Sequence, residues 1–285
     1  MGQRAELPGS NLYGLSNDLW ATMPLEAICA GFGDRMNGFG IYDDFLRFNP
    51  TSLADGYIIL STGSGTTLAP ITSEAHHPGI VRLLMDGDAA DDENVLQLGA
   101  GVDVGAFKFA ATDLCFEAYV RIGAAAAGDA ITDDNWAWFL GLATGGAAGA
   151  AITNLMMADT EPTIYATNSF VGFQKLVIET TALDGMYQLT GQTKVDGAVN
   201  TDLNAILTVA EATWYKLGLR YEATRKRLGW WVNGVELCHI GAAALDAAAF
   251  PDAVFLQPTI GAKTHGTSGD LYLDIDWWAC AQRSS

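Results

Sequence analysis

The stretch WYKLGLRYEATRKRLGWWVNGVELCHI, residues 214–240, constrains the fold more than any other part of the chain. Its first half alternates in character, with one face holding Tyr215, Leu217, Leu219 and Tyr221 and the other Trp214, Lys216, Gly218 and Arg220. Neighbouring side chains on a β-strand point to opposite faces, so this alternation predicts a half-buried strand. Polar residues 222–225 supply one chain reversal, and Asn233-Gly234 supplies a second turn of the kind that hairpins favour. The stretch therefore predicts a three-stranded antiparallel meander that ends at Ile240.

Short apolar runs separated by Gly, Asn and Asp continue along most of the chain. We expect further strands at 57–60, 80–85, 95–98, 116–122, 136–142, 170–178, 186–193 and 271–278. This density of short runs indicates a sandwich or a barrel. One helical patch, residues 242–250, is stopped by Pro251 and is long enough for only a turn or two.

Residues 1–40 differ from the rest because they mix polar and Gly-rich stretches with a few large apolar residues. We interpret them as an N-terminal arm and residues 41–285 as one sandwich domain. The arm either packs on its own sandwich or reaches a neighbouring molecule, and the sequence leaves both alternatives open.

Composition limits the classes of partner. Hydrophobic residues make up 49% of the 285 residues, which is ample for a packed core, and the formal net charge is −18. Such a charge argues against nucleic-acid binding, because phosphate contacts need clustered cations. There is no apolar signal-peptide core and no run that approaches a membrane span, so we expect a soluble protein made in the cytoplasm. The four cysteines contain no CxxC pair, and we expect them to remain reduced.

Several short motifs resemble those of a known fold family. The hairpin in which Arg220-Tyr221 is followed by a charged turn and then by Trp231-Val232-Asn233-Gly234-Val235 resembles the core hairpin of the concanavalin-like (laminin-G and legume-lectin type) β-sandwich. Residues 116–122 and 271–278 agree with it, and residues 41–45 (IYDDF) resemble the opening of such domains in tailed-phage virion proteins. The resemblance implies an all-β, concanavalin-like antiparallel β-sandwich (jelly roll) with an N-terminal arm, in a virion protein of the capsid decoration type.

The same fold hosts glycoside hydrolases, so a catalytic carboxylate pair must be sought. Retaining members carry Glu-x-Asp-x-x-Glu on one strand, which sets two carboxyl groups roughly 5 Å apart. That spacing does not occur in this sequence, and Asp274 and Asp276 share their strand with no Glu. We therefore expect no catalytic residues and a protein that is not an enzyme.

Three groups of residues are candidates for binding. Adjacent tryptophans place one ring of each pair outward, and we assign Trp231 and Trp278 to that position, as a sugar platform or as a surface covered by a subunit. Arg220, Arg225 and Arg227 fall on one hairpin, as solvated turn residues or as a docking spot for an acidic neighbour. Asp86, Asp88 and Asp91 could supply oxygen ligands to calcium, the one cofactor that the sequence leaves open, although a solvated acidic loop has the same pattern.

The leading hypothesis is a non-enzymatic structural protein of a bacteriophage particle, most plausibly a capsid decoration (cement) protein located in the virion. Its expected partners are the major capsid protein or another virion protein, and a homo-oligomer such as a trimer would cover outward aromatic rings. No nucleic acid and no membrane is expected among its partners. The alternatives are a carbohydrate-binding or receptor-binding virion module and, after that, a glycoside hydrolase with an atypical site.

Overall fold

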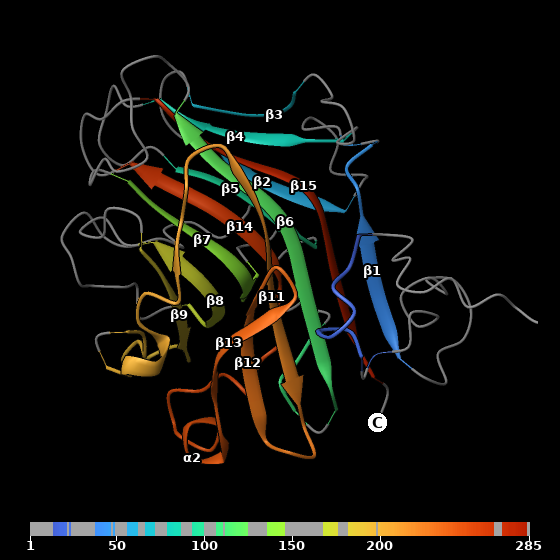
Figure 1. The fold of residues 1–285 in the computed structure, drawn as a ribbon, viewed down its shortest axis with the longest axis vertical. Coiled ribbons are helices and arrows are strands. Elements are labelled where there is room, and N and C mark those ends of the chain that lie inside the picture. Colours follow the sequence, from blue (N-terminus) through green and yellow to red (C-terminus); the bar gives the residue numbers. More distant parts are fainter. Residues whose placement is uncertain are drawn as a thin grey trace, which may run out of the picture.

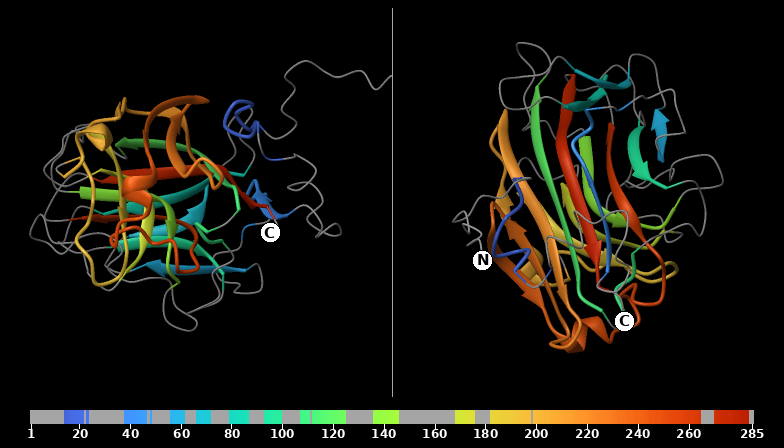
Figure 2. Two further views of the ribbon diagram at one scale, coloured as in Figure 1. Left: turned by 90° about the horizontal axis from the view of Figure 1, so that it is seen from below. Right: turned by 90° about the vertical axis from the view of Figure 1, so that its right-hand side faces the viewer.

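The computed structural model describes residues 14–21, 23, 38–46, 48, 56–61, 66–71, 79–86, 93–99, 107–110, 112–124, 136–145, 168–175, 182–197, 199–264 and 270–283. These residues form two antiparallel β-sheets that face each other as the layers of a sandwich (Figure 1, Figure 2). The predicted all-β antiparallel sandwich is therefore confirmed. Within the described ranges no helix combines the length and apolar composition needed to cross a bilayer.

The first layer, called sheet A, has eight strands. Its order is β13 (Val235–Ile240), β12 (Arg227–Val232), β11 (Thr213–Glu222), β6 (Leu114–Ala124), β15 (Leu271–Gln282), β4 (Val81–Met85) and β3 (Thr67–Pro70), and β1 (Phe39–Asp43) pairs with the end of β15. The first and last strands of the described fold thus lie side by side.

The second layer, called sheet B, has seven strands. Its order is β10 (Leu207–Thr208), β9 (Ala182–Gln188), β8 (Phe170–Lys175), β7 (Trp136–Ala143), β14 (Gln257–Thr264), β5 (Glu93–Leu98) and β2 (Tyr57–Ser61). A 3-10 turn, η2 (Thr201–Leu203), and one short helix, α2 (Ala242–Leu245), lie in the connections. The predicted helical patch thus forms one turn.

The main hydrophobic core fills the space between the sheets. Large side chains from both layers contribute to it, among them Trp136, Trp138, Phe173, Trp230 and Trp278. The indole Nε1 of Trp230 in sheet A donates a 2.8 Å hydrogen bond to the carbonyl of Gly172 in sheet B. This bond satisfies a buried donor and fixes the spacing of the layers at that point, as buried Trp side chains generally require.

The predicted three-stranded meander is confirmed, both in the order of its strands and in which side chains face the core. Leu217 pairs with Val232 and Leu228 with Ile240, so β11, β12 and β13 follow one another across the sheet. The four apolar residues of the first strand all enter the core, as their alternation predicted. Asn233 and Gly234 have φ values of 49° and 80°, the left-handed pair that a tight hairpin turn uses.

The described cysteines carry free thiols. Cys115 and Cys280 are buried and Cys238 is half-buried, and none of them is in a disulfide. Burial raises the pKa of Cys238 to about 12 and also raises the pKa of the Cys115 and Cys280 thiols. Protonated thiols of this kind pack as small apolar groups and react slowly. Cys29 lies outside the described residues.

Candidate functional site

The N-terminal segment, residues 14–21 and 23, lies on the face of sheet A that is turned away from sheet B, called the outer face (Figure 1, blue, in front of β6 and β15). Leu15, Leu19, Trp20 and Met23 are each 3% exposed or less. They pack in one cluster on Cys115, Trp231, Trp277, Ala279 and Ala281 of sheet A. Of the two alternatives for the arm, this part of it packs on its own sandwich; Leu25 and Ile28 lie outside the described residues.

A buried carboxylate holds this segment. Glu117 on β6 is 1% exposed, and its Oε2 accepts hydrogen bonds of 2.9 Å from both the Ser16 N–H and the Trp20 indole N–H. Burial raises the pKa of Glu117 above its ordinary 4.5, while the hydrogen bonds from Ser16 and Trp20 and the charge of Lys216 act in the opposite direction. The Lys216 ammonium donates to the Gly14 carbonyl. The segment is therefore fixed by directed polar contacts as well as by apolar packing.

Small residues make room for the segment. A Cβ added at Gly218 would lie 2.2 Å from Cδ1 of Leu19, so only glycine fits under that side chain as it stands. Cys115, Ala279 and Ala281 are the other small residues in the contact. Together with Glu117, Trp231 and Trp277 these residues form the surface under the segment that we call the socket.

The predicted outward position of Trp278 is wrong, and that of Trp231 is confirmed. Trp278 is 0% exposed and lies in the core between the sheets, whereas its neighbour Trp277 lies on the outer face. A β-bulge between Ile275 and Trp277 inserts one extra residue, which reverses the alternation beyond it. Trp231 does lie on the outer face, but the N-terminal segment covers it to 8% exposure.

Four aromatic rings form a row across the outer face, in the order Tyr42, Trp277, Tyr119 and Trp214. Their centroids are 5.0 to 6.1 Å apart and their planes differ by 28° to 31°. The Arg121 guanidinium also lies 4.7 Å from the centre of the Trp214 ring. Because the rings pack on one another and on an arginine, they do not present a row of free faces to a sugar.

Asp274 is a buried carboxylate on the outer face of sheet A that forms ion pairs with two arginines. It is 0% exposed and lies 2.7 Å from Nε of Arg82 and 2.6 Å from Nη2 of Arg121. Both arginines also lie over the ring of Tyr272. A carboxylate held between two guanidinium groups has its oxygens occupied, which suits a structural role better than catalysis.

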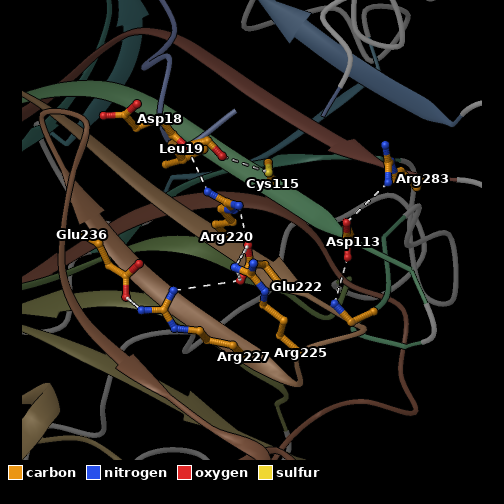
Figure 3. A network of polar contacts seen from close by, with 11 residues as sticks. Asp18, Leu19, Asp113, Cys115, Arg220, Glu222, Arg225, Arg227, Glu236 and Arg283 are labelled. Atoms are coloured by element: carbon orange, nitrogen blue, oxygen red, sulfur yellow. Dashed lines mark hydrogen bonds and ion pairs between the residues drawn. The ribbon is translucent and has the colours of Figure 1, made fainter. Parts of the chain in front are cut away.

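The predicted arginine cluster is a network around one buried carboxylate (Figure 3). Glu222 is 6% exposed; its Oε1 accepts from Arg220, and its Oε2 lies 3.3 Å from Arg225 and 4.0 Å from Arg227. Arg220 also donates a 2.9 Å hydrogen bond to the Asp18 carbonyl of the N-terminal segment. The side chain of Arg225 is 73% exposed, so of the three arginines it is the one most open to a partner.

The acidic loop gives no described metal site. Asp86 directly follows β4 and is the last residue of its described range, while Asp88 and Asp91 lie outside the described residues. Among the residues that can be assessed, no group of three or more His, Cys, Asp and Glu side chains is arranged to hold an ion. The calcium hypothesis thus stays a prediction.

Sheet B also carries polar side chains on the face turned away from the core. Gln97 Nε2 donates to Thr259 Oγ1 at 2.9 Å, and Gln257 lies two residues before Thr259 on the same face of β14. Gln257 is 1% exposed, and both atoms of its amide are buried without a hydrogen-bond partner. Buried amides are normally hydrogen-bonded, so this side chain is an exception among the described residues.

Comparison with known proteins supports the fold. No protein-family model and no curated protein sequence matches the chain. Among solved structures, a protein of unknown function from Shewanella oneidensis MR-1 matches with a TM-score of 0.54 and 15% identity over 88% of each chain. Basic winged bean lectin matches with a TM-score of 0.50 and 8% identity over 86% of this chain and 100% of the lectin. The chain has a concanavalin-like fold.

A third match within this concanavalin-like group is an enzyme. The endo-β-1,4-glucuronan lyase of Trichoderma reesei matches with a TM-score of 0.50 and 12% identity over 84% of this chain and 93% of the lyase. The structural neighbours of the jelly roll thus include a lectin and a polysaccharide lyase. At these identities the likeness establishes the fold alone, because one fold hosts many functions.

Sequence reasoning missed the residues that hold the N-terminal segment. The sequence predicts strands at Glu117 and Gly218 and an arm that contains Trp20, and it indicates no contact among these three residues. The sequence offers no local signal for them, since Glu117 and Arg121 at outward positions of the run 116–122 have the pattern of an ordinary solvated strand face. The partners of Glu117 lie about a hundred residues away and could not be named from the sequence.

Proposed function

We propose that this protein is a non-enzymatic structural protein of a bacteriophage particle, of the capsid decoration type. The supporting observation concerns residues 41–45, the segment that resembles the opening of tailed-phage virion domains. It pairs directly with the closing strand β15, with Ile41 opposite Cys280 and Asp43 opposite Trp278. The Phe45 ring then packs 5.5 Å from the Trp278 ring, and Asp43 caps the turn by accepting from the Phe45 N–H at 2.7 Å. The two motifs therefore form one structural unit.

Two buried carboxylates on the outer face of sheet A are engaged in contacts within the chain, which favours a non-catalytic role. Asp274 is shared by two arginines, and Glu117 is sealed under the N-terminal segment. A retaining glycosidase needs two carboxyl groups roughly 5 Å apart with access to a glycosidic bond. These two groups are instead committed to holding neighbouring parts of the same chain.

The proposed partners are the major capsid protein, or another virion protein, and further copies of this chain. The exposed Arg225 at the tip of the β11–β12 hairpin offers a cation to an acidic patch, on a chain whose net charge is otherwise −18. Rim charges of this kind set orientation and association rate more than affinity. No nucleic acid or membrane is part of the proposal.

The test is a binding experiment with particles assembled without this protein. Purified full-length chain is added to such particles, which are then sedimented. We expect the parent protein to pellet with the particles in a saturable manner and Arg225→Glu to bind more weakly. Lys226→Glu is the control, because Lys226 is the next residue and is already paired with Asp246 at 2.7 Å. No binding by the parent would contradict the proposal.

A carbohydrate-binding virion module is the second candidate. It is supported by the fold, since a lectin is among the structural neighbours of this chain. A glycan array probed with the parent protein tests this candidate. Saturable glycan signals would favour it over the decoration protein, whereas turnover of a polysaccharide would favour the glycosidase.

A further inference from the structure

The socket on the outer face of sheet A holds the N-terminal segment by apolar and polar contacts. Gly218 leaves room for Leu19, since an added Cβ would meet the Leu19 side chain at 2.2 Å. Glu117 accepts hydrogen bonds from the backbone N–H of Ser16 and the indole N–H of Trp20. Two cations, Lys216 and Arg220, donate to carbonyl groups of the segment, those of Gly14 and Asp18. These contacts hold the segment at the backbone of Gly14, Ser16 and Asp18 and at the indole of Trp20.

The N-terminal segment has its own local fold. The Trp20 N–H bonds to the Ser16 carbonyl at 3.1 Å and the Met23 N–H to the Trp20 carbonyl at 2.9 Å, as in a short helical turn. The backbone hydrogen bonds of its described residues do not extend a strand ladder of sheet A. The segment can therefore leave the socket without separating paired strands.

The chain between the segment and the sandwich is long. Residues 24–38, fifteen in number, separate Met23 from Phe39, where β1 begins. A chain of this length can span up to about 50 Å. It therefore suffices to place the segment on the socket of a neighbouring molecule as well as on its own.

We propose that the socket of one copy is filled by the N-terminal segment of a second copy when the protein assembles. The contacts within the socket are the same in both arrangements, so exchange of the segment costs little, as in other cases of domain swapping. An empty socket is unfavourable, because it would expose the apolar rings of Trp231 and Trp277 to water. The choice between the two arrangements is then set by local concentration, and close spacing of copies favours exchange.

This assembly mode is independent of which particle carries the protein. It is tested with purified full-length chains, so its failure would leave the virion proposal intact, and failure of the virion proposal would leave it intact.

The test is a complementation experiment with two variants. Leu19→Asp disrupts the apolar packing of the segment and leaves the socket unchanged. Gly218→Val blocks the socket and leaves the segment unchanged. Each protein is unfolded in urea and refolded at about 1 mM, within the millimolar range of effective concentrations that covalent linkage provides, and one variant carries ¹⁵N. Native mass spectrometry after dilution then counts monomers, homodimers and heterodimers.

We expect dimers of the parent, monomers of each variant alone, and a several-fold rise in heterodimer when the variants are mixed. Only exchange predicts this rise, because the intact segment of the Gly218→Val protein can then occupy the intact socket of the Leu19→Asp protein. Leu46→Asp, at a Leu that is 56% exposed, and Gly241→Val, where an added Cβ meets nothing within 4 Å, are the controls and should dimerise like the parent.

Three results would overturn the proposal: a parent that stays monomeric, a mixture with no more heterodimer than chance association of the separate variants, or dimers of every variant alike. Glu117→Ala is a second socket variant in case Gly218→Val does not refold. It removes the carboxylate that binds Ser16 and Trp20 and should behave as Gly218→Val does in the mixture.

Discussion

The indole N–H of Trp20 donates a 2.9 Å hydrogen bond to Oε2 of Glu117, a residue 97 positions later in the chain. The bond joins the N-terminal segment to the middle of sheet A. It also gives a buried carboxylate the partner that it needs, because an unpaired charge at 1% exposure would be costly. The docking of the segment is thus a specific contact and can be tested atom by atom.

Replacement of Trp20 by Phe tests this bond. Trp20→Phe removes the N–H donor and leaves Glu117 with one bond fewer, so we expect the free energy of unfolding to fall by about 1–2 kcal/mol more than in the control. The control is Trp231→Phe, in the same cluster, because the Nε1 of Trp231 has no hydrogen-bond partner to lose. Urea unfolding measures both, and equal losses would contradict the role of the bond.

The raised pKa of Glu117 predicts a pH dependence of stability. Burial lifts this pKa above 4.5 in the folded protein, so the folded state binds the proton more tightly than the unfolded state. The associated stability is present below the unfolded pKa and is lost as the pH rises through the folded pKa. The Oε1 of Glu117 has no partner and can take the proton while Oε2 keeps both hydrogen bonds.

The measurement compares the parent with Glu117→Gln between about pH 4 and pH 8. The difference between their free energies of unfolding isolates this one group, since all other titrations are shared. We expect the parent to lose stability relative to the variant as the pH rises. A relative gain over the same range would show that the hydrogen bonds outweigh burial.

Asp274 is predicted to be structural. Asp274→Ala leaves the guanidinium groups of Arg82 and Arg121 without their carboxylate, and we expect a loss of about 3 kcal/mol in the free energy of unfolding. Asp246→Ala breaks the pair with Lys226, in which both side chains are more than half exposed, and should cost less than about 1 kcal/mol. Similar losses in the two variants would be inconsistent with this account.

The turn at Asn233-Gly234 gives a backbone prediction. Gly234 has a φ of 80°, which a β-branched residue resists, so Gly234→Val should cost about 1–3 kcal/mol and lower the melting temperature. Gly241→Val introduces the same side chain at a position with open space and should melt close to the parent. If the two variants melt together, backbone strain at the turn is not the cause.

The parts of the fold that were predictable from the sequence are those governed by local alternation. The faces of β11 and the turn before β13 follow from neighbouring residues alone, and both predictions are confirmed. Strand β14, Gln257–Thr264, was not predicted, because its Pro, Gly and Lys residues hide a strand that is buried on both faces. Burial of that kind comes from the rest of the fold and leaves no periodic signal.

The candidate site was less predictable, for two physical reasons. The bulge near Asp276 reverses the facing of every later residue of β15, so a strict two-residue period assigned Trp278 to the wrong side. The socket depends on contacts between a segment near the N-terminus and strands that lie about 100 to 260 residues later in the sequence. No local pattern around Trp20 or Gly218 encodes that contact.

The most direct test of the central proposal is quantitative mass spectrometry of purified particles from a phage whose genome encodes this chain. The protein should be present at many copies per particle, in a fixed ratio to the major capsid protein that is unchanged by further purification and by high salt. Absence of the chain from particles that contain their full set of capsid and tail proteins would contradict the assignment to the virion.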